Sequence, residues 1–235
     1  MSESKNFIQG SGGGGGKAGG GGGGTPTVAD DTLASVQYAS VLDLLCEGEI
    51  DGVENDLTFA TAWKKSIFLN DVPLANANGT ENFKNYYVDL RNGTQGQGPM
   101  PGFTDIENEV AVGVTVTKDS PHTRTITDSN VDKIRVTLGI PALQKIEDDG
   151  DIKGHKVKVA IEIQYNNGGF VEVISDTIKG KSSSAYNRDY IIPITGGSFP
   201  VDVKLVRKSN DETDQKKTST TIFQSYTEII EEKLI

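Results

Sequence analysis

The sequence has 235 residues, enough for one large domain or two small ones, and 28 of them are glycine. Its formal net charge of −10 argues against nucleic acid or an anionic membrane surface as a partner, because phosphate binding needs a basic face. The single cysteine, Cys46, excludes an intrachain disulfide framework, and no apolar run approaches the ~20 residues of a membrane-spanning helix.

Residues 1–30 are predicted to form a flexible, disordered, glycine-rich tail. The runs Gly12–Gly16 and Gly19–Gly24 cannot hold a defined backbone, because glycine loses the most entropy on ordering. A phosphate-binding loop would need spaced glycines between a strand and a helix. We therefore expect a linker, or a segment that becomes ordered only on assembly.

Residues 31–95 are predicted to be a separate region that begins with a short helix. Ser40 is a suitable N-cap, and Asp43 completes a capping-box pattern. The apolar body of this helix is Val41, Leu42, Leu44 and Leu45. Cys46 follows on the apolar side, where a buried structural thiol is expected and a nucleophile is not.

The same region is predicted to contain strands. The alternation in Ser66–Leu74 indicates a half-buried strand, with a tight turn at Asn70-Asp71 and a sheet edge at Pro73. Phe83–Leu90 has a β-rich composition and is also expected to be a strand. A glycine- and proline-rich loop, Asn92–Phe103, then marks the domain boundary.

Residues 96–235 are predicted to form a β-sandwich of the fibronectin-III or immunoglobulin-like type. Strands with alternating apolar residues recur at the ~8–12-residue spacing of such folds, and roughly seven are expected. The predicted strands are Val110–Thr117, Lys133–Ile140, Val157–Tyr165, Phe170–Ile174, Tyr190–Ile194, Val201–Val206 and Thr220–Ile230. A hairpin turn is predicted at Asn166–Gly169. The fold class is therefore mainly β.

No catalytic, cofactor-binding or metal-binding residues are predicted, and an enzyme is not expected. His122 and His155 lie in polar loops without convergent partners. Glu147–Asp151 lacks the register of a calcium loop and is expected to be a solvated hairpin turn, with a weak cation site as the alternative. Ser182–Ser184 has no base beside it and is interpreted as a flexible crossing between strands. Scattered lysines, including Lys181, are expected on a solvated face.

Several long segments resemble the tip attachment protein J (host specificity protein J) family of lambda-like tailed phages. The residues that carry the resemblance are Glu47–Val53, Ser66–Leu74, Ser120–Leu143, Asp176–Ser184 and Ser225–Ile230, with a looser match at Gln97 and Pro101–Phe103. They lie in the same order and spacing as in that family. The resemblance spans nearly the whole chain after residue 31.

The resemblance implies a structural component at the start of a phage tail-tip hub, located in the virion and made in the host cytoplasm. Residues 31–95 would open a hub domain, and residues 96–235 would be a sandwich inserted into it. The implied partners are two further copies in a homotrimer and other tail-tip and tail-tube proteins, with roles in host attachment and DNA entry. Family members continue far beyond this point, so receptor binding is expected only from a C-terminal part that this chain lacks.

Two alternatives come from other functional classes. A carbohydrate-binding sandwich would use exposed aromatics, with Trp63, Tyr86 and Tyr87 as candidates. A cell-wall hydrolase would need paired carboxylates in a cleft or a metal centre, and the sequence offers neither at a useful spacing.

Overall fold

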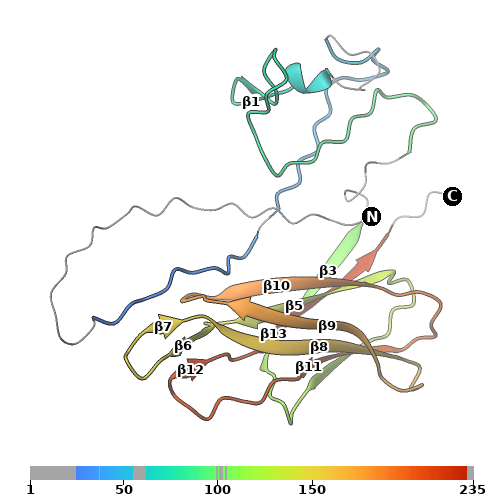
Figure 1. Ribbon diagram of the computed structural model, residues 1–235. Helices are drawn as coiled ribbons and strands as arrows, with labels where there is room; N and C mark the ends of the chain where they lie inside the picture. The colour runs from blue at the N-terminus through green and yellow to red at the C-terminus, as the bar shows by residue number, and fades with distance from the viewer. Residues whose placement is uncertain are drawn as a thin grey trace. The chain divides into compact units, whose positions relative to one another are not determined.

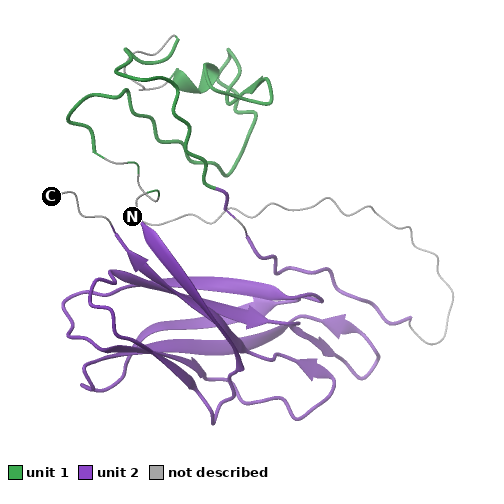
Figure 2. Cartoon of the chain, turned by 180° about the vertical axis from the view of Figure 1, so that it is seen from behind, with its two compact units in different colours: residues 1–19, 40–103 green, residues 20–39, 104–235 purple. Residues whose placement is uncertain are grey.

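The computed structural model describes residues 25–36, 38–54, 62–98, 100, 103 and 105–231. The glycine runs predicted to be flexible lie outside these residues. The chain divides into two compact units (Figure 2). Of the described residues, unit 1 holds those between 40 and 103, and unit 2 holds residues 25–39 and those between 104 and 231. The division of the sequence at residues 30 and 95 stays a prediction.

Unit 2 is built on two four-stranded antiparallel sheets (Figure 1). The first sheet has the order β10 (Tyr186–Pro193), β5 (Lys133–Ile140), β13 (Ile222–Ile230) and β3 (Ile106–Thr115). The second has the order β4 (His122–Ile126), β11 (Val201–Arg207), β8 (His155–Tyr165) and β9 (Val171–Gly180). The predicted β-sandwich is confirmed.

The core lies between these sheets because alternate residues of each strand point inward. Ile134, Val136 and Leu138 of β5 are fully buried, as the alternation predicted. In β8 the inward series begins with the buried Val157 and Val159. Clusters of this kind on both sheets, rather than any single contact, supply the hydrophobic stabilisation of the unit.

The backbone angles confirm two of the predicted turns. Asn166 and Asn167 have positive φ angles of 42° and 59° in the hairpin between β8 and β9. Asn70 and Asp71 have φ angles of 47° and 62° between β1 (Phe68–Leu69) and β2 (Val72–Pro73) of unit 1. Asparagine and aspartate tolerate this left-handed region better than other non-glycine residues do.

The sandwich contains eight strands, one more than the sequence indicated, because β4 was missed. Its sequence, His122–Ile126, is polar at all of the first four positions, and β4 pairs only with β11 at the sheet edge. A strand that is hydrated on its free side needs little apolar alternation. His122 is therefore the first residue of a strand, which corrects its predicted place in a loop.

A small third sheet lies beside the sandwich, in the order β12 (Lys217–Thr218), β6 (Gln144–Ile146) and β7 (Ile152–Lys153). The acidic run Glu147–Asp151 is the turn between β6 and β7, as predicted. The crossing at Ser182–Ser184 is fixed at one end, contrary to the prediction. Ser182 is 2% exposed, and its backbone exchanges two hydrogen bonds of 2.9 and 3.0 Å with Leu143.

Unit 1 has little regular structure among its described residues: a 3₁₀ turn, η1 (Trp63–Lys65), and the β1–β2 hairpin. Only Leu74 and Ala75 of its described apolar residues are buried. Phe83–Leu90 is not a strand, because no neighbouring strand pairs with it and β propensity depends on such neighbours. No helix among the described residues has the length and apolar character needed to span a membrane.

The predicted helix after Ser40 is also absent, and residues 40–53 are irregular. A helix this short is marginal unless it packs an apolar face against the protein. Here that face has no cover: Leu44 is 90% exposed and Leu45 is 71% exposed. Cys46 is exposed as well, so the expected buried thiol is wrong.

Candidate functional site

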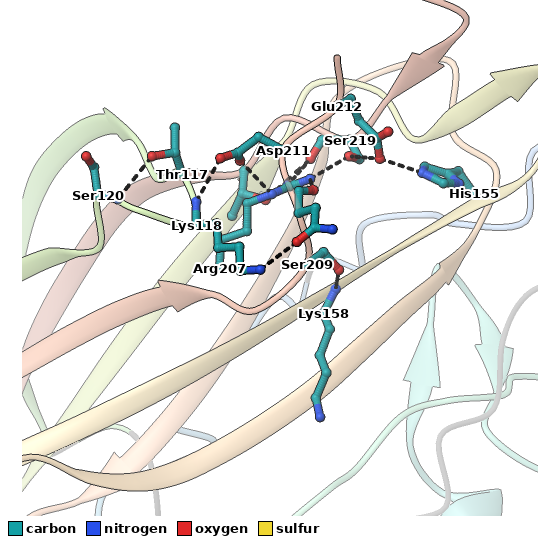
Figure 3. Close-up of polar contacts among 12 residues, drawn as sticks. Thr117, Lys118, Ser120, His155, Lys158, Arg207, Ser209, Asp211, Glu212 and Ser219 are labelled. Atoms are coloured by element: carbon teal, nitrogen blue, oxygen red, sulfur yellow. Dashed lines mark hydrogen bonds and ion pairs between the residues drawn. The ribbon is translucent and has the colours of Figure 1, made fainter. Parts of the chain in front are cut away.

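The densest polar cluster of the sandwich surrounds the buried Arg207 at the end of β11 (Figure 3). Its guanidinium donates to Ser219 Oγ at 2.7 Å, to Thr221 Oγ1 at 2.6 Å and to the Asn210 carbonyl at 3.1 Å. Nε lies 3.0 Å from Asp211 Oδ1. Burial lowers the pKa of Arg207, while Asp211 and Glu212 oppose that effect. The fork of donors ties the end of β11 to the residues between β12 and β13.

A second branch of this cluster contains both a serine and a histidine. Ser219 Oγ donates to Glu212 Oε1 at 3.1 Å, and His155 Nε2 lies 2.7 Å from the same oxygen (Figure 3). Burial raises the pKa of Glu212, but the hydrogen bonds from His155 and Ser219 outweigh it and leave the pKa below its ordinary value. The carboxylate stands between serine and histidine, so His155 is not placed to take the Ser219 proton.

The same loop is joined to the β3–β4 connection. Lys118 donates its backbone N–H to Asp211 Oδ2 at 3.0 Å and its ammonium to Asn210 Oδ1 at 2.6 Å. Ser209 Oγ accepts the backbone N–H of Lys158 at 2.8 Å (Figure 3). These three hydrogen bonds hold the loop after β11 in place, so this part of the cluster has a structural role.

The other histidine lies apart from this cluster. His122 is half-buried and meets the Phe223 ring edge-on, with centroids 6.1 Å apart. Burial, and then the charge of Arg124, lower the pKa of His122. Within the described part of the chain, no three histidine, cysteine, aspartate or glutamate side chains gather as they would around a metal ion.

Several charges on the outer face of the second sheet are paired. Glu162 contacts Lys204 Nζ at 2.6 Å and Lys208 Nζ at 3.2 Å, and Lys208 reaches Glu172 at 3.0 Å. The hydrogen bond from Lys204 is the main cause of the lowered pKa of Glu162. The Lys204 ammonium also lies 3.6 Å from the centroid of the Phe170 ring. These pairs neutralise Lys204 and Lys208, so the two lysines do not act as free cations for a polyanion.

A feature that sequence reasoning missed is the N-terminal strap, which we define as residues 25–35. It runs along the sandwich beside β7, where Val28 pairs in parallel with Ile152 (dark blue in Figure 1). Ala29 N–H donates to the Ile152 carbonyl at 2.9 Å, and Ile152 N–H donates to the Thr27 carbonyl at 2.8 Å. Thr27 Oγ1 also donates to Asp151 Oδ1 at 2.6 Å. Nothing in the polar composition of the strap signals these pairings.

An ion pair anchors the middle of the strap. Lys181 Nζ lies 2.5 Å from Asp31 Oδ1, and the Lys181 side chain is 5% exposed. Ser183 donates its N–H at 3.0 Å and its hydroxyl at 2.5 Å to Asp31 Oδ2. The hydrogen bond from Lys181, and then those from Ser183, lower the pKa of Asp31 to about 2. Lys181 is therefore buried and paired, which corrects its predicted place on a solvated face.

Beyond the strap the chain exposes a run of large apolar side chains. Val36 is 59% exposed and Tyr38 is 86% exposed, and the run continues through Val41, Leu42, Leu44 and Leu45. Contiguous exposed apolar side chains are typical of an interaction surface. We call residues 36–45 the apolar segment.

The three aromatics considered for carbohydrate binding differ in exposure. Lys64 Nζ lies 5.7 Å from the Trp63 ring centroid and 5.5 Å from that of Tyr86, and both aromatic residues are half-buried. Tyr87 is 84% exposed. The Lys64 ammonium thus makes cation–π contacts with the Trp63 and Tyr86 rings, which is a packing role for both aromatics.

Comparison with known proteins gives one family. The model of the FNIII-A domain of tip attachment protein J matches residues 106–232. A tip attachment protein J of Escherichia phage SECphi27 is 32% identical over 208 residues, which cover 88% of this chain and 17% of the relative. That of Escherichia phage SECphi4 is 35% identical over 213 residues, which cover 89% and 18%. The chain thus spans less than a fifth of the curated relatives it matches.

Solved structures show only a weak likeness. The structure titled "CBM4 structure and function" has a TM-score of 0.28 and 10% identity, and the match covers 54% of this chain and 71% of that one. A TM-score this low supports no conclusion about the fold or the function of this chain.

Proposed function

The chain belongs to the tip attachment protein J family, and from this premise we propose that it forms the first part of a trimeric tail-tip hub. The family is one of structural proteins of the phage virion, at the tip of the tail. The observation that carries the proposal is the match over both units, 88–89% of the chain at 32–35% identity. Residues 31–95 open the hub domain, and the sandwich is inserted into it.

The proposed mechanism is assembly without catalysis. Three copies close the distal end of the tail tube, contact other tail proteins, and contribute to host attachment and DNA entry. The exposed apolar segment supports a contact between subunits, because burial of apolar area is the main driving force of association. Receptor binding belongs to later parts of the longer relatives.

Mass photometry of the purified chain across a concentration series tests the proposal. We expect trimers at high concentration and dissociation to single chains on dilution. The variant Leu44→Asp/Leu45→Asp should abolish the trimer, because charges would replace two of the most exposed apolar side chains of the segment. The matched control is Ile191→Asp, which changes a 57% exposed apolar residue of the sandwich and should leave the trimer intact. Single chains at every concentration would refute the trimer.

A further inference from the structure

The sandwich carries a docking surface for an extended segment, and the strap covers it. We call it the strap groove, and its residues are Gly150, Asp151, Ile152, Gly180, Lys181 and Ser183. A lysine side chain that is only 5% exposed, such as that of Lys181, is costly to bury without a counter-charge. Asp31 of the strap supplies that charge.

The shape of the groove is as specific as its charge. A Cβ atom on Gly180 would lie 2.7 Å from Thr32 Oγ1 and 2.8 Å from Leu33 Cγ. A Cβ atom on Gly150 would lie 2.9 Å from Pro26 Cγ. Two glycines thus leave the space that the strap fills, and Leu33 packs against the core cluster. The groove is therefore matched to this segment along its length.

The strap is far in sequence from the residues of the strap groove that it contacts. Its side-chain contacts span 124–152 residues of sequence, and the part of unit 1 at residues 40–103 lies in between. The strap pairs with β7 and packs Leu33 against the core cluster, so it docks on the sandwich without being a strand of either four-stranded sheet. In an oligomer, every copy offers the same strap and the same groove, and exchange between copies costs no contact.

We propose that in the assembled protein the strap of one copy occupies the strap groove of a second copy. The argument for the second copy is the apolar segment, which directly follows the strap and is largely exposed in the single chain. A strap that crosses to a neighbour carries this segment across the boundary between subunits, where its side chains become buried. The inference rests on the proposed trimer and adds the contact that links its subunits.

Disulfide trapping between single-cysteine chains tests the exchange. Cys46 is replaced by serine, and Thr27→Cys and Asp151→Cys are placed in separate chains, since Thr27 Oγ1 and Asp151 Oδ1 lie 2.6 Å apart. The two variants are coexpressed, purified as the oligomer, and treated with oxidant or with a short bis-maleimide crosslinker. Each variant expressed alone is the control. A third sample carries both cysteines in one chain.

We expect a covalent dimer in the coexpressed sample that is absent from each variant alone, because only a strap in a neighbour's groove joins the two cysteines. An oligomer without this dimer, in which the double-cysteine chain crosslinks within itself, would overturn the exchange and leave the proposed function standing. A protein that stays single-chain at all concentrations would overturn both. A crosslink equally strong in either variant alone would also count against the exchange, since it reports random collisions.

Discussion

Replacing Asp31 by asparagine should loosen the strap and destabilise unit 2. The pKa of Asp31 is lowered from 3.8 to about 2, which corresponds to at most about 2 kcal/mol of folding free energy. The Asp31 side chain is 35% exposed, so solvent screening reduces this to about 1 kcal/mol. The variant also leaves the buried Lys181 ammonium unpaired, which brings the expected loss to about 1–3 kcal/mol.

The pH dependence has a definite sign. Because the folded protein depresses the pKa of Asp31, its contribution is fully present above pH 3.8. The contribution is lost as the pH falls from 3.8 through about 2, where the folded protein also takes up the proton. Wild-type protein should therefore lose more stability than Asp31→Asn over this interval.

The assay must report on unit 2. The only tryptophan, Trp63, lies in unit 1, so its fluorescence does not follow the sandwich. Urea denaturation by far-UV circular dichroism, with hydrogen exchange of residues 25–35, measures global and local stability together. The matched control is Asp148→Asn, a fully exposed carboxylate paired with Lys216, which should change nothing measurable. Equal stability and equal exchange in the two variants would refute the reasoning.

Three further substitutions test other parts of the fold. Gly180→Ala places a methyl group against Thr32 and Leu33. It should lower the free energy of unfolding by about 1–3 kcal/mol and speed hydrogen exchange in the strap. Unchanged exchange would contradict the close approach of the strap to Gly180. Phe223→Ala removes a fully buried side chain and should lower the free energy of unfolding, measured by urea denaturation, by about 3–5 kcal/mol. A loss below ~1 kcal/mol would mean that the core is not packed as described. Arg207→Met removes the hydrogen-bond donors that hold Ser219 and the loop before it. A protease should therefore cut residues 208–216 faster than in the wild type. Equal rates of cleavage would show that the loop is held without the Arg207 hydrogen bonds.

The candidate site shows where pattern reasoning stops. His155 lies 57 positions before Glu212, and only the folding of β8 against the loop after β11 brings the two together. The strap is a stronger case, since Asp31 and Lys181 are 150 positions apart. No local pattern marks either residue as half of an ion pair, and Lys181 was expected on a solvated face.

The sequence by itself determined seven of the eight strands of the sandwich, because inward positions such as those of β5 and β8 alternate with period two and burial follows that period directly. It also determined the turns at Asn70-Asp71 and Asn166-Asn167, because few residues tolerate their backbone angles. Only the tertiary structure decided the state of the segment after Ser40. Local capping signals favour a helix there, but a helix so short forms only against an apolar surface, and the described chain gives it none.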